Sequence, residues 1–148
     1  MKIKPEQSVP AVLKRAFDAF LANDPISIAE SFSLDARLTT QLDPQISQAL
    51  GLDAIDGPIV ASSAVGILRF YAYQLSMFEV KDSEIVAISD CNGGLDVTSR
   101  WTVKASATGE HYEGFNRNRY LLDSSGRKLT AGQGYCGLVP AYASLISN

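Results

Sequence analysis

The sequence has little of what metal sites and disulfide scaffolds need. Its 148 residues include one histidine, His111, and two cysteines, Cys91 and Cys136. The cysteines lack C-x-x-C spacing and have no histidine-rich tract beside them, so we expect no metal site of the usual Cys/His kind. Two reduced thiols in a cytoplasmic protein are expected, although the sequence leaves open a disulfide between them.

Positive charge and long apolar runs are also scarce. The 13 Lys and Arg are outnumbered by 16 Asp and Glu, which gives a net charge of −3 and no reason to expect nucleic acid or an anionic membrane as a partner. No apolar run approaches the roughly 18 residues of a membrane span, and no apolar segment follows the N-terminal lysines as in a secretory signal. We therefore predict a single cytoplasmic domain over residues 1–148, with residues 1–7 flexible.

Hydrophobic periodicity predicts helices in the first half of the chain. Ser8 and Pro10 are typical of a helix start, and apolar residues then recur every three or four positions. Asn23-Asp24-Pro25 ends this helix and begins a short second one over residues 26–32. A strand over 34–42 and a helical turn or two over 44–53 should follow. Residues 58–78 predict a long third helix, because this dense apolar run is too long for a strand.

Alternating strands separated by turn signals fill residues 79–136. Asn92-Gly93 is the strongest of these signals, since Asn-Gly favours a two-residue hairpin loop, and it pairs Ile88 with Val97. A two-residue loop at Gly109-Glu110 and a four-residue loop at the third turn complete the predicted antiparallel pairing. In that register Trp101 lies opposite Asn118.

These pairings predict two different faces of the sheet. The inward face combines apolar with neutral polar side chains: Val97, Ser99, Trp101, Val103, Asn116, Asn118, Tyr120, Leu122, Leu129, Ala131, Gln133 and Tyr135. The outward face is dominated by positive charge, from Arg100, Lys104, Arg117, Arg119 and Lys128. A half-buried sheet packs one face on helices, so the first face should border the core. A third loop one residue shorter would exchange Gln133 and Tyr135 for Gly132 and Gly134.

Several short motifs follow one another in a characteristic order. They are Phe17-Asp18-Ala19-Phe20, Asn23-Asp24-Pro25, Arg100-Trp101-Thr102, Thr108-Gly109-Glu110, the turn 123–128 and Gly134-Tyr135. With the order of helices and strands, they make residues 8–138 resemble the NTF2-like superfamily, in its SnoaL-like and ketosteroid-isomerase-like branch. The resemblance implies an α+β cone, in which a strongly curved antiparallel or mixed sheet wraps around an N-terminal helical hairpin and a long third helix. It also implies a small-ligand pocket and a homodimer formed through the outer sheet face.

Neutral hydrogen-bonding groups are the main binding candidates. Asn116, Asn118 and Gln133, with Tyr120, could orient a polar atom of a ligand, or could satisfy one another. The remaining candidates for the pocket wall are Trp101, Tyr135 and Tyr71. Arg100 would face the pocket, as the resemblance to epoxide hydrolases of this fold implies, only if a bulge turned its strand.

Relatives carry an acid near Asp35, which makes Asp35 the candidate general base and Tyr120 the candidate donor to a developing oxyanion. The alternative is a solvent-exposed capping residue. Tyr135-Cys136-Gly137 and Arg100-Trp101-Thr102 each lack a carboxylate that relatives keep. Two functions stay open. The protein either performs isomerase-, cyclase- or hydrolase-type acid/base chemistry on a small apolar or polycyclic molecule, without cofactor or metal, or is a non-catalytic ligand-binding or dimeric interaction module.

Overall fold

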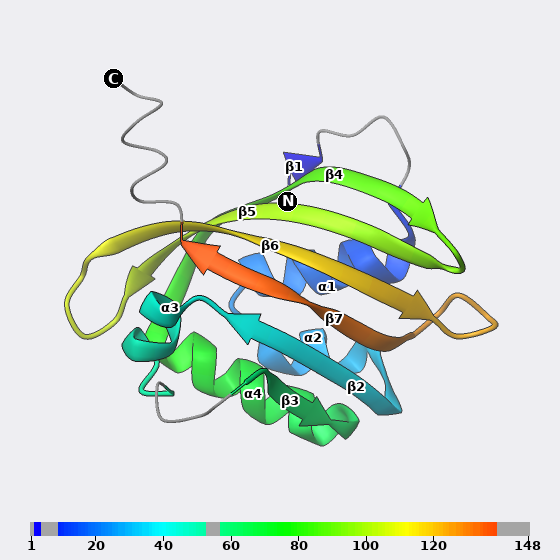
Figure 1. The fold of residues 1–148 in the computed structure, drawn as a ribbon, viewed down its shortest axis with the longest axis horizontal. Coiled ribbons are helices and arrows are strands. Elements are labelled where there is room, and N and C mark those ends of the chain that lie inside the picture. Colours follow the sequence, from blue (N-terminus) through cyan, green and yellow to red (C-terminus); the bar gives the residue numbers. More distant parts are fainter. Residues whose placement is uncertain (1, 4–8, 53–56, 139–148) are drawn as a thin grey trace.

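One curved sheet with helices against one of its faces forms the computed structural model, which describes residues 2–3, 9–52 and 57–138 (Figure 1). The elements are β1 (Lys2–Ile3), α1 (Ala11–Leu21), α2 (Pro25–Glu30), β2 (Phe32–Leu42), α3 (Pro44–Ala49), β3 (Ile59–Ser62), α4 (Ser63–Met77), β4 (Phe78–Cys91), β5 (Gly94–Ala105), β6 (His111–Leu122) and β7 (Leu129–Leu138). The sheet order is β1-β4-β5-β6-β7-β2-β3, with β1/β4 and β2/β7 parallel and the other pairs antiparallel. The predicted α+β fold with a mixed sheet is confirmed.

The helical hairpin forms where the sequence predicts it. The Asp24 carboxylate caps α2 by accepting a hydrogen bond from the Ser27 backbone N–H at 3.2 Å. Asn23 adopts a positive φ of 58° in the turn. Its side chain accepts from the Val80 backbone N–H at 2.7 Å and donates to the Val80 carbonyl at 3.2 Å. The Asn-Asp-Pro motif therefore both turns the chain and fixes the hairpin to β4. The predicted start at Ser8 and most of segment 1–7 lie outside the described residues.

The predicted helix over 58–78 was wrong at its beginning. Residues 59–62 form β3, which pairs with β2 so that Val60 lies opposite Thr39. Ser63, with a φ of 69°, then turns the chain into α4. Periodicity misses this strand because a short apolar run fits either a helix or a strand, and the strand that pairs with it lies earlier in the chain, beyond α3. The short strand β1 was not predicted either.

Bulges in β4 and β7 and a longer loop between β5 and β6 changed the predicted registers. Asn92 and Gly93 have φ values of 46° and 82° and form the expected hairpin turn, which confirms the pairing of Ile88 with Val97. At the third turn Leu122 pairs with Leu129 as predicted, but Leu121 pairs with Ala131, so Thr130 is an extra residue. Such a bulge shifts the rest of β7 by one position. The loop between β5 and β6 is also longer than expected.

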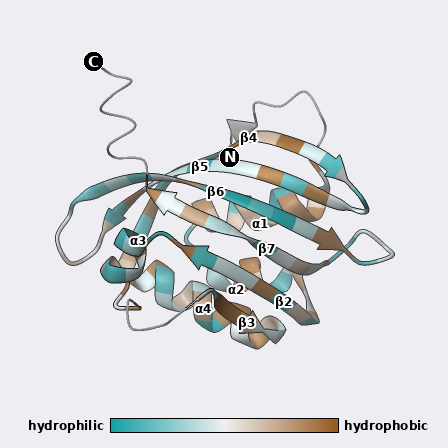
Figure 2. Cartoon of the chain, in the orientation of Figure 1, coloured by the Kyte–Doolittle hydropathy of each residue, from teal (hydrophilic) through white to brown (hydrophobic). Residues whose placement is uncertain are grey.

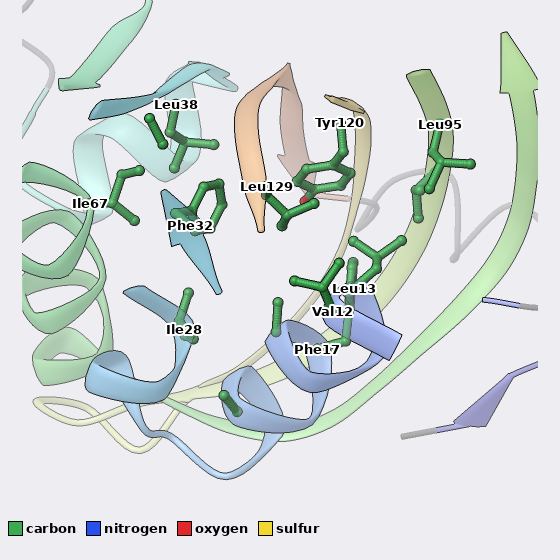
Figure 3. Close-up of a cluster of buried hydrophobic side chains, with 14 of the residues drawn as sticks. Val12, Leu13, Phe17, Ile28, Phe32, Leu38, Ile67, Leu95, Tyr120 and Leu129 are labelled. Atoms are coloured by element: carbon green, nitrogen blue, oxygen red, sulfur yellow. The ribbon is translucent and has the colours of Figure 1, made fainter. Parts of the chain in front are cut away.

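Hydrophilic and hydrophobic residues are interspersed along the strands (Figure 2). Side chains from α1, α2, α4 and the inner face of the sheet meet in one buried cluster, which includes Leu13, Ile67 and Leu129 (Figure 3). A second cluster surrounds Trp101 and includes Cys136, a free, buried thiol; the side chain of Cys91 is outside the described part. No helix in the described residues is long and apolar enough to cross a membrane.

Candidate functional site

A cavity lies between the four helices and the inner face of the sheet. Strands β2 and β4–β7 and helices α1–α4 all contribute to its lining. The space open to the centre of a water-sized sphere is about 80 Å³. Since roughly 10–15 Å³ by this measure holds one water, the cavity can accept a small organic molecule.

Aromatic rings from both the helices and the sheet contribute to the cavity wall. Nine of them contribute to the lining: Phe17, Phe20, Phe32, Phe70, Tyr71, Phe78, Trp101, Tyr112 and Tyr120. Edge-to-face contacts join several of them, with centroid separations of 5.2 Å between Phe70 and Tyr71 and 6.0 Å between Phe78 and Tyr112. Such pairs stabilise a particular ring orientation, so the wall has a defined shape.

Two hydrogen-bonded pairs supply polar groups on the sheet side. The Trp101 indole Nε1–H donates to Asn116 Oδ1 at 3.0 Å, and Asn118 Nδ2 donates to the Tyr120 hydroxyl oxygen at 3.0 Å. Tyr71, on α4, also lines the cavity. Burial raises the pKa of the Tyr120 hydroxyl to about 12, although the hydrogen bond from Asn118 acts in the opposite direction. Burial, and then the neighbouring Tyr120, raise the pKa of Tyr71 as well. Both phenols are therefore uncharged at neutral pH.

Glycines on the inner face let these side chains approach the backbone of the sheet closely. A Cβ on Gly114 would lie 2.3 Å from two ring carbons of Trp101, and one on Gly134 would lie 1.9 Å from Asn118 Oδ1. Gly132 is in similar contact with the Tyr120 ring, at 3.2 Å. The sequence analysis missed this role. The signal was the alternation of Gly132 and Gly134, which places both on one face of β7.

Five predicted binding residues come together at the cavity: Trp101, Asn116, Asn118, Tyr120 and Tyr71. For β5 and β6 the predicted pairing was wrong, since Trp101 lies opposite Gly114 and not Asn118. The predicted register differs from the observed one by four residues, which is an even number, so the same side chains still face inward. The choice of Trp101 over Arg100 as the inward residue is confirmed.

Three other predicted binding residues lie on the outer face of the sheet. The Thr130 bulge turns Gln133 and Tyr135 outward, so their predicted inward orientation was wrong. The Tyr135 hydroxyl donates to Asp43 Oδ2 at 3.3 Å. Arg100 is exposed and forms an ion pair with Glu113, so no bulge turns it toward the cavity.

Asp35 is exposed on β2, where its carboxylate accepts a hydrogen bond from the Ser33 hydroxyl at 3.2 Å. It does not line the cavity. Within the described residues the lining contains no Asp, Glu, His, Lys or Arg. Burial raises the pKa of the Cys136 thiol to about 12, so this group also stays protonated. No cluster of three potential metal-ligating side chains occurs in the described part of the chain. The cavity thus offers apolar contacts and neutral hydrogen bonds.

Comparison with solved structures identifies the fold. A ketosteroid isomerase-like protein from Catenulispora acidiphila, in complex with trimethylamine, matches with a TM-score of 0.67 and 11% identity over 86% of each chain. A ketosteroid isomerase-like protein from Erwinia carotovora atroseptica matches with a TM-score of 0.60 and 15% identity, over 87% of this chain and 92% of that one. An NTF2-like protein of unknown function from Burkholderia pseudomallei matches with a TM-score of 0.61 and 12% identity, over 92% of both.

No protein-family model matches the sequence, and no curated protein matches it significantly. Identities this low support the fold and leave the activity open. The α+β architecture with a curved mixed sheet agrees with the structural matches. The chain has the NTF2-like, ketosteroid isomerase-like fold.

Proposed function

We propose that the protein binds a small, uncharged and mostly apolar molecule in the cavity, without acid/base catalysis. The observation that carries this proposal is the composition of the cavity lining. Aromatic and aliphatic side chains surround neutral polar groups there, and none of the described residues that line the cavity is charged. Burial of apolar surface stabilises such a complex by roughly 25 cal/mol per Å² before the costs of association. A charged ligand would lose its hydration without gaining an ion pair.

The placement of Asp35 argues against the catalytic alternative. A general base must come within hydrogen-bond reach of the proton that it removes, and its pKa should lie near the working pH. Asp35 is exposed and outside the lining. The tyrosines and Cys136, which do line the cavity, have pKa values raised far above neutral. The lining thus favours binding over proton transfer.

The size of the cavity narrows the ligand further. About 80 Å³ of accessible space is roughly half of the 150 Å³ of an engineered apolar cavity that holds benzene, so the ligand should be no larger than one small ring. A polycyclic ligand would require the helices to move away from the sheet. We therefore propose a single small ring or a short branched chain.

Trp101 provides a direct assay, since it is the only tryptophan in the chain and lines the cavity. Native mass spectrometry of the purified protein should first reveal any retained molecule. Trp101 fluorescence should then report titration with methylenecyclopentane, cyclopentanecarboxylate and cyclopentylammonium. We expect the uncharged compound to bind at least about tenfold more tightly than either ion. Equal or tighter binding of an ion, or no binding of the uncharged compound, would contradict the proposal.

A second candidate ligand is a methylated ammonium ion. Nine aromatic residues contribute to the cavity wall, and aromatic faces attract such cations. The Catenulispora protein of this fold was solved with trimethylamine. Tetramethylammonium chloride, titrated against Trp101 fluorescence with sodium chloride as the ionic control, tests this candidate. Saturable quenching by tetramethylammonium alone would favour it over the uncharged ligand.

We also propose a homodimer formed through the outer face of the sheet. Phe115 and Tyr135 contact each other there, with centroids 5.8 Å apart and ring planes tilted by 40°, and Tyr135 is 37% exposed. A partly exposed aromatic pair of this kind gains stability when a second copy covers it. Sedimentation equilibrium should show a dimer that Tyr135→Lys weakens. A monomer at all concentrations would contradict this proposal.

A further inference from the structure

The hydrogen bond between Trp101 and Asn116 determines how the Asn116 carboxamide is oriented. An indole N–H can only donate, so the group that faces it must be the amide oxygen. The Asn116 Nδ2 is thereby directed elsewhere, and it forms no hydrogen bond with another described residue. No fully buried side-chain N or O atom in the described part of the chain lacks a partner. The Asn116 amide nitrogen must therefore border open space, and Asn116 lines the cavity.

Packing holds the indole in this position. Trp101 is 8% exposed and belongs to a buried cluster that includes Phe78 and Val103. Its ring lies directly over Gly114, so the sheet supports it from below. A side chain packed in this way keeps one rotamer. The indole N–H is therefore fixed, and the Asn116 amide protons remain as donors.

A second donor lies further along the same strand. Tyr120 accepts a hydrogen bond from Asn118 through its hydroxyl oxygen, which leaves the phenolic proton available. Asn116, Asn118 and Tyr120 alternate along β6 and so share its inner face. The sheet side of the cavity thus presents N–H and O–H groups, and the lining that the described residues form adds neither charge nor a titrating base.

We infer that Asn116 determines ligand specificity by donating to an uncharged hydrogen-bond acceptor, such as a carbonyl oxygen, and that Trp101 is its positioning residue. This inference rests on the proposed function, since it names the polar atom that the bound molecule carries. A ligand of the same shape without an acceptor leaves the Asn116 amide desolvated and unpaired, which lowers its affinity.

A matched pair of probes separates this inference from the proposed function. Cyclopentanone and methylenecyclopentane have nearly the same shape, and only the ketone accepts a strong hydrogen bond. Titration of the full-length, ¹⁵N-labelled protein followed by NMR gives both dissociation constants and the shifts of the Asn116 side-chain amide protons. We expect the ketone to bind about fivefold more tightly, as one net hydrogen bond provides. The amide protons should move downfield with the ketone alone.

Variants test the two assigned roles. Asn116→Asp can still accept from Trp101 but has no amide protons, so the preference for the ketone should disappear. Trp101→Phe removes the indole N–H and frees the Asn116 carboxamide to turn. The ratio of the affinities for the ketone and for methylenecyclopentane should therefore fall toward one. Ile28→Val alters the cavity lining on α2, and Ile28 belongs to a different buried cluster from Trp101. It should weaken both probes equally and keep their ratio.

Equal affinities for the two probes in the wild type would overturn the inference and leave the proposed function standing. A ketone preference that persists in Asn116→Asp would also overturn it. Binding of neither probe would refute the proposed function and this inference together. If Asn116→Asp does not fold, the wild-type affinity ratio and the Asn116 amide shifts decide the question.

Discussion

Substitution of Gly114 by alanine should destabilise the fold by about 3 kcal/mol. The new Cβ would lie 2.3 Å from two carbons of the Trp101 ring and 2.5 Å from the Gly137 carbonyl oxygen. Carbon atoms in contact are ordinarily about 3.5–4.0 Å apart, so the ring would have to move by more than about 1 Å. The Gly137 oxygen belongs to the backbone and can move only if β7 bends.

Overpacking of this kind typically costs about 1–3 kcal/mol, and the backbone contact places Gly114→Ala at the upper end. For a chain of this size each kcal/mol corresponds to about 2–4 °C in Tm. We therefore expect Tm to fall by about 6–12 °C. The displaced indole should also lose its hydrogen bond to Asn116 and become more exposed, so that native Trp101 fluorescence shifts to longer wavelength.

Gly66→Ala in α4 is the matched control. The nearest atoms to its new Cβ would be 3.7–3.9 Å away, which is ordinary contact. Alanine in a helix interior is favoured over glycine, so this variant should be stabilised by about 0.5–1 kcal/mol. Urea denaturation followed by circular dichroism measures both variants. If Gly114→Ala unfolds at the wild-type midpoint, the Trp101 ring does not lie over Gly114 and the described cavity wall is wrong.

Three further predictions concern the core, the titrating groups and the outer face. Leu129→Ala should lower the free energy of unfolding, measured by urea denaturation, by about 2–5 kcal/mol, because the Leu129 side chain is 0% exposed. Leu34 is 87% exposed, so Leu34→Ala should change this free energy by less than about 0.5 kcal/mol. Burial raises the pKa of Tyr120 from 10.0 and that of Cys136 from 9.0, each to about 12, so the folded state keeps protons that the unfolded chain loses. Stability should hold up to about pH 9 and decline toward pH 12; an unchanged urea midpoint across this range would count against the burial of these groups. Arg100→Met should leave probe binding unchanged. It should change the free energy of unfolding by less than about 1 kcal/mol, since the ion pair of Arg100 is exposed.

The alternation of residues in β5 and β6 was sufficient to predict most of the site. Trp101 and Asn116 line the cavity as predicted, although their strands pair four residues away from the expected register, with Trp101 opposite Gly114. Side chains in a strand alternate with a period of two, so an even slip leaves every residue on its face. The helical hairpin was equally predictable, because its Asn-Asp-Pro turn and apolar stripe are local signals.

The bulge at Thr130, by contrast, was decided by the tertiary structure. It shifts β7 by one residue and so turns Gln133 outward and Gly134 inward. A bulge leaves no mark in the alternation of a short strand, and the close contact between Gly134 and Asn118 depends on which strands are neighbours.

Local sequence could not predict that Asp35 is exposed, because the exposure of its side chain depends on how the helices pack against the sheet. The chain by itself determined the helices and strands other than β1 and β3, and the inner face of two strands. The packing of distant segments decided that this face encloses a cavity with neutral donors, and that no carboxylate from the described residues lines it.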